Sequence, residues 1–180
     1  MNISKSFQEV ASRCEDAFSN NDLQALRLAV EDLESYLAST PAAPLEELAV
    51  AAGLLIDAGA ALGLRTAVEQ GQLIFVQNWD TLLPVYGAAQ LNYNVGNAHK
   101  ALYDIERTQV GWQFNIASAD FILKAKAGYW RALSETQPGK ITPKLLTNLG
   151  NALDASGRVI DALHYYDLQR PAPSDPIAVT

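Results

Sequence analysis

Hydrophobic residues recur at every third or fourth position along most of this chain, a spacing that gathers them on one face of an α-helix. The apolar stretches are separated by short segments with Pro, Gly, Asn or Asp, which favour turns and helix ends. The pattern therefore predicts an all-α protein of about eight helices, paired into consecutive antiparallel hairpins. We expect these hairpins over residues 4–39, 44–79, 84–133 and 142–169.

The last of these hairpins has the clearest pattern. Gly150 and Leu153 share one face of its first helix, and Gly157 supplies the left-handed backbone that often follows a helix end. Ala162 and Tyr166 of the second helix face back toward them. Because Gly150 and Ala162 are small, we expect the two helices to approach closely, with Leu153 and Tyr166 filling the space beside them.

Parts of this pattern occur earlier in the chain. Residues 59–75 contain two Gly, a Leu and a Phe at the same gaps, displaced by 91 positions. The stretch 94–98, Asn-Val-Gly-Asn-Ala, is nearly identical to 148–152, Asn-Leu-Gly-Asn-Ala. The displacements between units predict an insertion near 107–117 in the third hairpin, which either lengthens its helices or forms a separate excursion.

Over roughly 46–169 the chain resembles the tetratricopeptide repeat, a helix–turn–helix unit of about 34 residues. The resemblance implies a right-handed superhelix whose concave face is lined by the first helix of each unit. It departs from the family pattern at His99, which stands where the last unit has Leu153, and at Gln169, where a small residue is usual.

The domain organisation follows from this assignment. We expect residues 1–43 to form a helical hairpin or cap, residues 44–170 to form the repeats, and residues 171–180 to be a Pro-rich tail. Such arrays normally end in a capping unit with a polar outer face. None is visible here, so the tail, a second copy or another chain should cover the last hairpin.

Composition narrows the function. The 180 residues carry a formal net charge of −7 and no basic stripe, which argues against nucleic acid and against a membrane surface as partners. The apolar run 48–64 contains Asp57 and many small residues, so it predicts a buried bundle helix. Cys14 is the single cysteine and we expect it to be buried. With no visible signal peptide, a cytoplasmic location is expected.

The sequence predicts no enzyme activity, no cofactor and no metal site. It lacks phosphate-binding glycine loops and common hydrolase motifs, and its two histidines, His99 and His164, are far apart. Carboxylates such as Glu46 and Glu47 are expected to form a solvated face. The chain also resembles the repeat region of bacterial proteins that carry HEPN-type nuclease domains, and Arg158 with His164 formally fits the HEPN pattern. This second resemblance implies an alternative function, a regulatory or sensing subunit of a bacterial nuclease or toxin-type defence system with a separate effector.

The leading hypothesis is a protein-interaction scaffold that binds a peptide or a partner domain on its concave face. Asparagine is a mediocre helix former, yet four occur in two five-residue stretches, and its amide suits the backbone of an extended peptide. An alternative is that these residues only cap turns and solvate a helix. Self-association through the last hairpin is a further hypothesis, since a second copy of the chain is one of the ways to cover that hairpin. The candidate partner-binding residues are Tyr93, Asn94, Asn97, Lys144, Asn148 and Asn151, together with Trp112 of the insertion.

Overall fold

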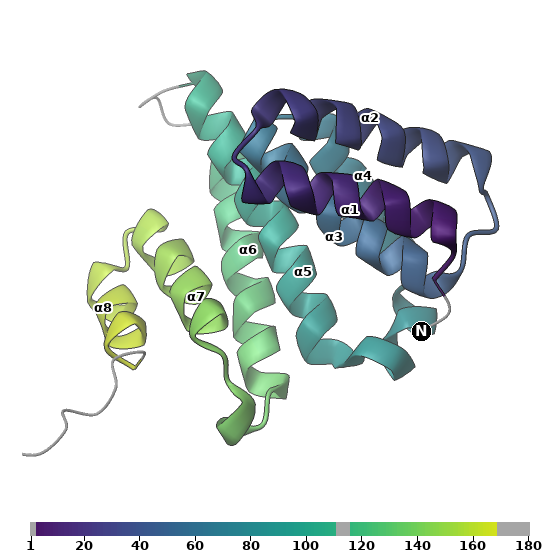
Figure 1. Ribbon diagram of the computed structural model, residues 1–180. Coiled ribbons are helices and arrows are strands. Elements are labelled where there is room, and N and C mark those ends of the chain that lie inside the picture. The colour runs from purple at the N-terminus through teal and green to yellow at the C-terminus, as the bar shows by residue number, and fades with distance from the viewer. Residues whose placement is uncertain (1–2, 111–115, 169–180) are drawn as a thin grey trace, which may run out of the picture.

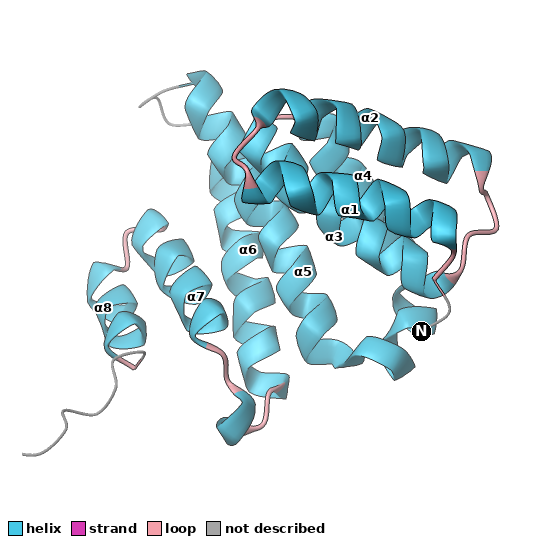
Figure 2. Ribbon diagram, viewed as in Figure 1, coloured by secondary structure: helices cyan, strands magenta, loops and turns pink. Residues whose placement is uncertain are grey.

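A computed structural model describes residues 3–110 and 116–168, and within these ranges the chain is helical with no strand (Figure 2). The all-α prediction is confirmed. The eight α-helices of the described residues are α1 Lys5–Ser19, α2 Leu23–Ser39, α3 Leu45–Leu62, α4 Arg65–Gln77, α5 Trp79–Val110, α6 Ile116–Glu135, α7 Pro143–Ala155 and α8 Val159–Asp167, with a short 3₁₀ turn, η1 Pro138–Lys140, before α7.

Several helices begin and end at residues suited to those places. Ser4 accepts a hydrogen bond from the backbone N–H of Phe7, and Asp22 accepts two from the first turn of α2, at 3.0 and 2.9 Å. Gly63 and Gly157 adopt φ values of 66° and 81° after α3 and α7. These left-handed turns reverse the chain and thereby form the second and fourth hairpins.

Consecutive helices pair as α1–α2, α3–α4, α5–α6 and α7–α8, and each hairpin packs on the next (Figure 1). The helices α1 and α2 contact α3, α3 and α4 contact α5, and α5 and α6 contact α7. Each of these contacts therefore lies within a hairpin or joins two neighbouring hairpins. This one-dimensional arrangement is typical of repeat proteins.

The third hairpin is much longer than the others. Its first helix, α5, has 32 residues and its second, α6, has 20, whereas α4 has 13 and α8 has 9. Of the expected insertion near 107–117, residues 107–110 lie in α5 and residues 116–117 in α6, whereas residues 111–115, including Trp112, lie outside the described part of the chain.

The start of α5 differs from the expectation that Pro84 opens a helix. Helical structure begins at Trp79, which was expected to end α4, and Gly87 interrupts it with φ 75° and ψ 156°. These angles are not helical and are readily available only to glycine. The segment before Gly87 is consequently a separate helical piece, and the long packed part of α5 follows it.

Three apolar clusters form the core. One joins α1 and α2 to α3 and contains Cys14, which is fully buried as expected. A second joins α3 and α4 to α5, and the third joins α6 to α7 and α8. Each cluster includes residues from adjacent hairpins, so the core runs along the stack. In the described residues no helix is long and apolar enough to span a membrane.

The expectation of a solvated acidic face is wrong for Glu47. Its side chain is fully buried, and it accepts hydrogen bonds from the backbone N–H of Ser4 at 2.6 Å and from the Tyr36 hydroxyl. Burial by itself raises the pKa of this carboxyl, but the hydrogen bonds from Tyr36 and Ser4 outweigh it, so the pKa is lowered. Glu47 therefore attaches the first hairpin to α3.

Candidate binding groove

The stretch 94–98 lies in α5 at the point where α6 crosses most closely. A Cβ added to Gly96 would lie 2.8 Å from the Tyr129 ring, and one added to Gly128 would lie 3.0 Å from the Gly96 Cα. In the last hairpin, a Cβ on Gly150 would lie 2.8 Å from Cδ1 of Tyr166. Glycine is thus required at positions 96 and 150, because an aromatic ring from the second helix of each hairpin occupies the space that a Cβ would need.

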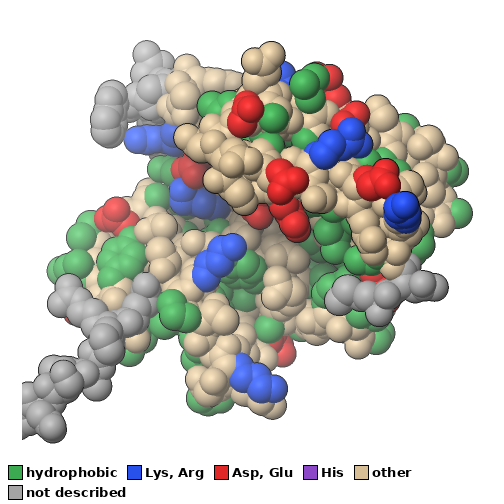
Figure 3. Space-filling model, in the orientation of Figure 1, with side chains coloured by type: hydrophobic (Ala, Val, Ile, Leu, Met, Phe, Trp, Pro, Cys, Tyr) green, Lys and Arg blue, Asp and Glu red, His purple; other side chains and the backbone are tan. Residues whose placement is uncertain are grey.

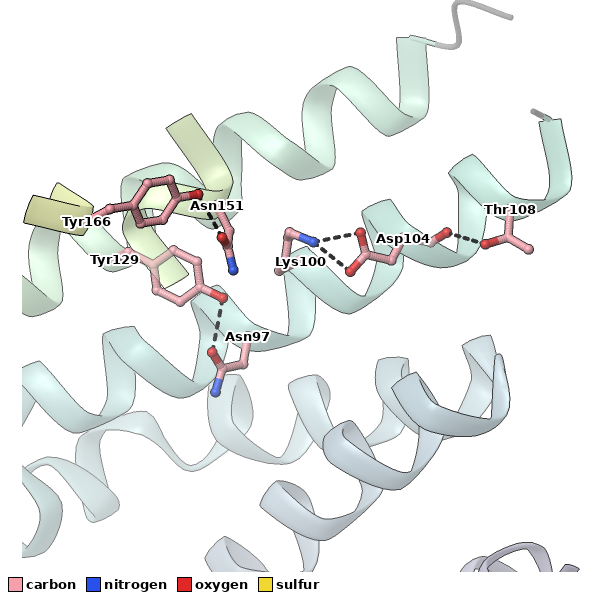
Figure 4. A network of polar contacts seen from close by, with 7 residues as sticks. All are labelled: Asn97, Lys100, Asp104, Thr108, Tyr129, Asn151 and Tyr166. Carbon is pink, nitrogen blue, oxygen red and sulfur yellow. Dashed lines mark hydrogen bonds and ion pairs between the residues drawn. The ribbon is translucent and has the colours of Figure 1, made fainter. Parts of the chain in front are cut away.

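The asparagine after each of these glycines accepts a hydrogen bond from the same tyrosine. Tyr129 donates its hydroxyl to Oδ1 of Asn97 at 3.0 Å, and Tyr166 donates to Oδ1 of Asn151 at 2.8 Å (Figure 4). Burial raises the pKa of the Tyr129 hydroxyl far above its usual range, so the hydroxyl stays protonated and remains a donor. The two pairs are repeats of one structural unit.

Asn148 connects the last two hairpins. Its amide nitrogen donates to the Tyr93 hydroxyl and to Oδ1 of Asn97, both at 3.0 Å. The rings of Tyr93 and Tyr129 lie 5.9 Å apart in a tilted arrangement. Side chains from α5, α6 and α7 therefore form one polar network at the junction of these helices, in which Oδ1 of Asn97 accepts two hydrogen bonds.

This network borders a groove made of two hollows that share Lys144. The first, of about 380 Å³, is lined by residues of α5 that include Tyr93, by Thr136 just after α6, by Lys140 of η1 and by the start of α7 with Lys144. The second, of about 270 Å³, lies between α3, α5 and α7. In the space-filling view this face is recessed between the N-terminal hairpins and the last hairpin (Figure 3). We call the two hollows together the groove.

Charges of both signs line the second hollow. Lys100 and Asp104 form an ion pair at 2.6 Å, whereas Lys144 has no hydrogen-bond or ion-pair partner within the described residues. Asp57 remains accessible to solvent, yet the surrounding protein raises the pKa of its carboxyl by excluding water, and the charge of Lys144 opposes that rise. A polar ligand would meet an unpaired ammonium group and a carboxylate on opposite sides.

The structure brings together most of the predicted site residues. Tyr93 and Lys144 line the first hollow, and Lys144 also lines the second, together with Asn97, Asn148 and Asn151. Asn94 is the exception, since its Oδ1 accepts a hydrogen bond from Gln90 at 2.9 Å and it lines neither hollow. Trp112 lies outside the described residues.

Asp57 is a groove residue that the sequence interpretation missed. Within the apolar run 48–64 its charge indicates only that the run does not span a membrane. The displacement of 91 positions that aligns Gly59 with Gly150 also aligns Asp57 with Asn148, so the signal was present in the sequence. Ala60 lines the second hollow as well, and the same displacement aligns it with Asn151. The groove is therefore lined at two equivalent places by the residue two positions before the close-packed glycine and by the residue just after that glycine.

The residues considered for catalysis have other contacts. Arg158 pairs with Asp161 at 2.6 Å, and His164 is exposed beside the Tyr165 ring. His99 packs between helices, against Phe121 and the Gln72 amide. Within 3–110 and 116–168, no three His, Cys, Asp or Glu side chains are arranged to hold a metal ion.

Comparison of the chain with models of protein families, with curated proteins and with solved structures gives no match.

Proposed function

We propose that this chain is a non-catalytic scaffold of the tetratricopeptide type, which binds an extended peptide segment of a partner protein in the groove. One observation carries the proposal. The repeat register places Asp57, Asn97, Asn148 and Asn151 around a single hollow, beside a lysine with no partner in the described residues.

Hydrogen-bonding capacity remains in the groove after the internal bonds are made. Asn97 and Asn151 use their Oδ1 atoms to accept from tyrosines, and no described group accepts from the amide nitrogen of Asn151. Asn148 uses its amide nitrogen, and no described group donates to its Oδ1. The groove thus offers both donors and an acceptor, which is what an extended peptide backbone needs.

The first hollow adds an apolar contribution. Ala89, Leu145 and the Tyr93 ring contribute to its lining beside polar groups. An aromatic ring next to hydrogen-bonding groups can pack against a ligand side chain while the amides hold its backbone. We therefore favour a largely uncharged segment that extends from the first hollow into the second.

The test uses peptides selected by the purified protein from a displayed library of random twelve-residue sequences, followed by titration of synthetic copies. Lys144→Ala and Asn148→Ala should each weaken binding about two- to tenfold, the effect of about 0.5–1.5 kcal/mol per lost hydrogen bond. Asn148 is preferable to Asn97 because its loss leaves the Tyr129 hydroxyl paired.

Lys5→Ala is the matched control, since it removes the same charge from the exposed start of α1, away from the groove. It should bind the selected peptides like wild type. Peptides retained equally by all three variants would place the binding surface elsewhere and contradict the proposal. Circular dichroism and melting temperatures near wild type must accompany each measurement.

A further inference from the structure

Two opposite charges in the second hollow of the groove have no partner of their own. Lys100 donates to both carboxylate oxygens of Asp104 at 2.6 Å, so this pair is complete within α5 (Figure 4). The side chains of Lys144 and Asp57 also line the hollow, yet neither makes a hydrogen bond or an ion pair within residues 3–110 and 116–168. The hollow therefore has one closed and one open pair of charges.

The two open charges belong to different hairpins. Asp57 lies in α3 of the second hairpin and Lys144 in α7 of the last, and both helices pack against α5. Both side chains are exposed. The charge of Lys144 nevertheless acts on the Asp57 carboxyl, because it opposes the rise in pKa that the surrounding protein causes by excluding water. A ligand between them would thus meet a cation on one wall and an anion on the other.

The first hollow differs from the second in its charge. Its lining includes Lys140 and Lys144 and, among the described residues, no carboxylate. Two lysines in one hollow stand out in a chain of formal net charge −7. Because Lys144 lines both hollows and Asp57 lines only the second, the open charges along the groove run from positive to negative.

We propose that the bound segment carries an acidic side chain between the two hollows, next to Lys144, and a basic side chain within the second hollow, next to Asp57. This charge order rests on the proposed function, and it refines the largely uncharged segment expected there to one with no net charge. Opposite charges across an interface favour the correct partner and the correct register, since a shifted or reversed segment would bring like charges together.

Charge reversal tests this order. Peptides are selected from the displayed library, and those weakened by Asn148→Ala are taken as groove-bound, because this substitution changes no charge. Each is synthesised with blocked termini, both as selected and with its acidic residue changed to lysine and its basic residue to glutamate. The wild-type chain should bind the swapped peptide about tenfold or more weakly, whereas the variant Lys144→Glu with Asp57→Lys should show the opposite preference.

The matched control is Lys5→Glu with Glu9→Lys, which makes the same two reversals on the exposed surface of α1. It should keep the wild-type preference. Because Lys144 and Asp57 are exposed, their reversal should leave the circular dichroism near wild type. Should it alter the helical content, the preference of the wild-type chain alone decides.

Groove-bound peptides that lack the two charges, or that bind equally well in both forms, overturn the charge order and leave the proposed function standing. Loss of binding on blocking the termini does the same, because a terminal group would then be the one recognised. If no selected peptide is weakened by Asn148→Ala, the proposed function fails and the charge order fails with it.

Discussion

The second and third hairpins solve the same packing problem with different chemistry. Phe75 and Tyr129 occupy equivalent positions and are each 1% exposed. The residue after the close-packed glycine is Ala60 in the second hairpin and Asn97 in the third. One additional oxygen at a buried ring needs a hydrogen-bond partner, and Asn97 supplies it at 3.0 Å. The last hairpin repeats the polar solution with Tyr166 and Asn151.

The comparison shows that the repeated asparagines have a structural role as well as the proposed binding role. In each polar hairpin the Oδ1 atom of the asparagine accepts a hydrogen bond from the tyrosine hydroxyl. Where the ring has no hydroxyl, the groove is lined by an alanine instead. The polarity of the residue just after the glycine therefore follows from whether the buried ring carries a hydroxyl.

The largest expected change in the free energy of unfolding concerns the close approach of the two helices within a hairpin. A Cβ on Gly71 would lie 2.5 Å from the backbone carbonyl oxygen of Ala52, which cannot rotate away. We expect Gly71→Ala to lower the free energy of unfolding by about 2–3 kcal/mol, since overpacking outweighs the better helix propensity of alanine. Urea denaturation measures this change.

Gly53→Ala is the control for that substitution, because nothing lies within 4 Å of its added Cβ in the same region of α3. Here only the propensity term remains, and the free energy of unfolding should rise by up to about 1 kcal/mol. Equal effects of the two substitutions would show that the α3–α4 contact is looser than described.

A second prediction converts the third hairpin to the chemistry of the second. Asn97→Ala leaves the buried Tyr129 hydroxyl without its acceptor and should cost about 1–3 kcal/mol of stability. Tyr129→Phe in the same chain removes the orphaned hydroxyl and should recover part of that loss. The double-mutant cycle from urea denaturation then gives a coupling energy of about 1 kcal/mol between the two side chains.

The equivalent cycle in the last hairpin is Asn151→Ala with Tyr166→Phe. Tyr166 is only partly buried and its hydroxyl can bind water, so its coupling energy should be smaller. A coupling energy near zero in both hairpins would remove the structural explanation of the asparagines.

The smallest effect concerns His99, which replaces the leucine found at Leu62 and Leu153. Burial lowers the pKa of the His99 imidazole, as does nearby Lys124, while Asp120 opposes the shift. The unfolded chain therefore binds the proton more tightly than the folded one. Stability from this residue is fully present above about pH 6.5, the ordinary histidine value, and is lost as the pH falls through the lower folded pKa.

His99→Leu should accordingly flatten the dependence of stability on pH between about 5 and 6.5, by a fraction of a kcal/mol. Urea midpoints at several pH values measure the slope. A slope that is unchanged in His99→Leu would contradict the assignment.

Local chemistry made much of the fold predictable from sequence. Gly157 is recognisable as a left-handed turn, because it satisfies a need of its own few neighbours. Groove residues such as Asn97 and Asn151 could be found because repetition places them on one face. Asp57 obeys the same register, but it lies within an apolar run, where its charge by itself indicates only a buried helix that does not span a membrane.

Contacts between residues that are not related by the repeat spacing could not be predicted from the sequence. Glu47 resembles an exposed first-turn carboxylate until Tyr36 and the backbone of Ser4, 11 and 43 residues away, converge on it. Asn94 shares the spacing of Asn148, yet it bonds along its own helix to Gln90. Equivalent positions thus acquire different partners once neighbouring hairpins are in place.

The buried carboxylate of Glu47 also affects how the stack responds to acid. Two polar bonds from the first hairpin depend on its negative charge, whereas the apolar contacts around them do not respond to protons. Because the folded pKa of Glu47 is lowered, its contribution is complete above the ordinary glutamate value and disappears as the pH falls through the folded pKa. Acid therefore loosens the attachment of α1 and α2 while their internal packing persists, and the proton acts as a ligand of the N-terminal end of the stack.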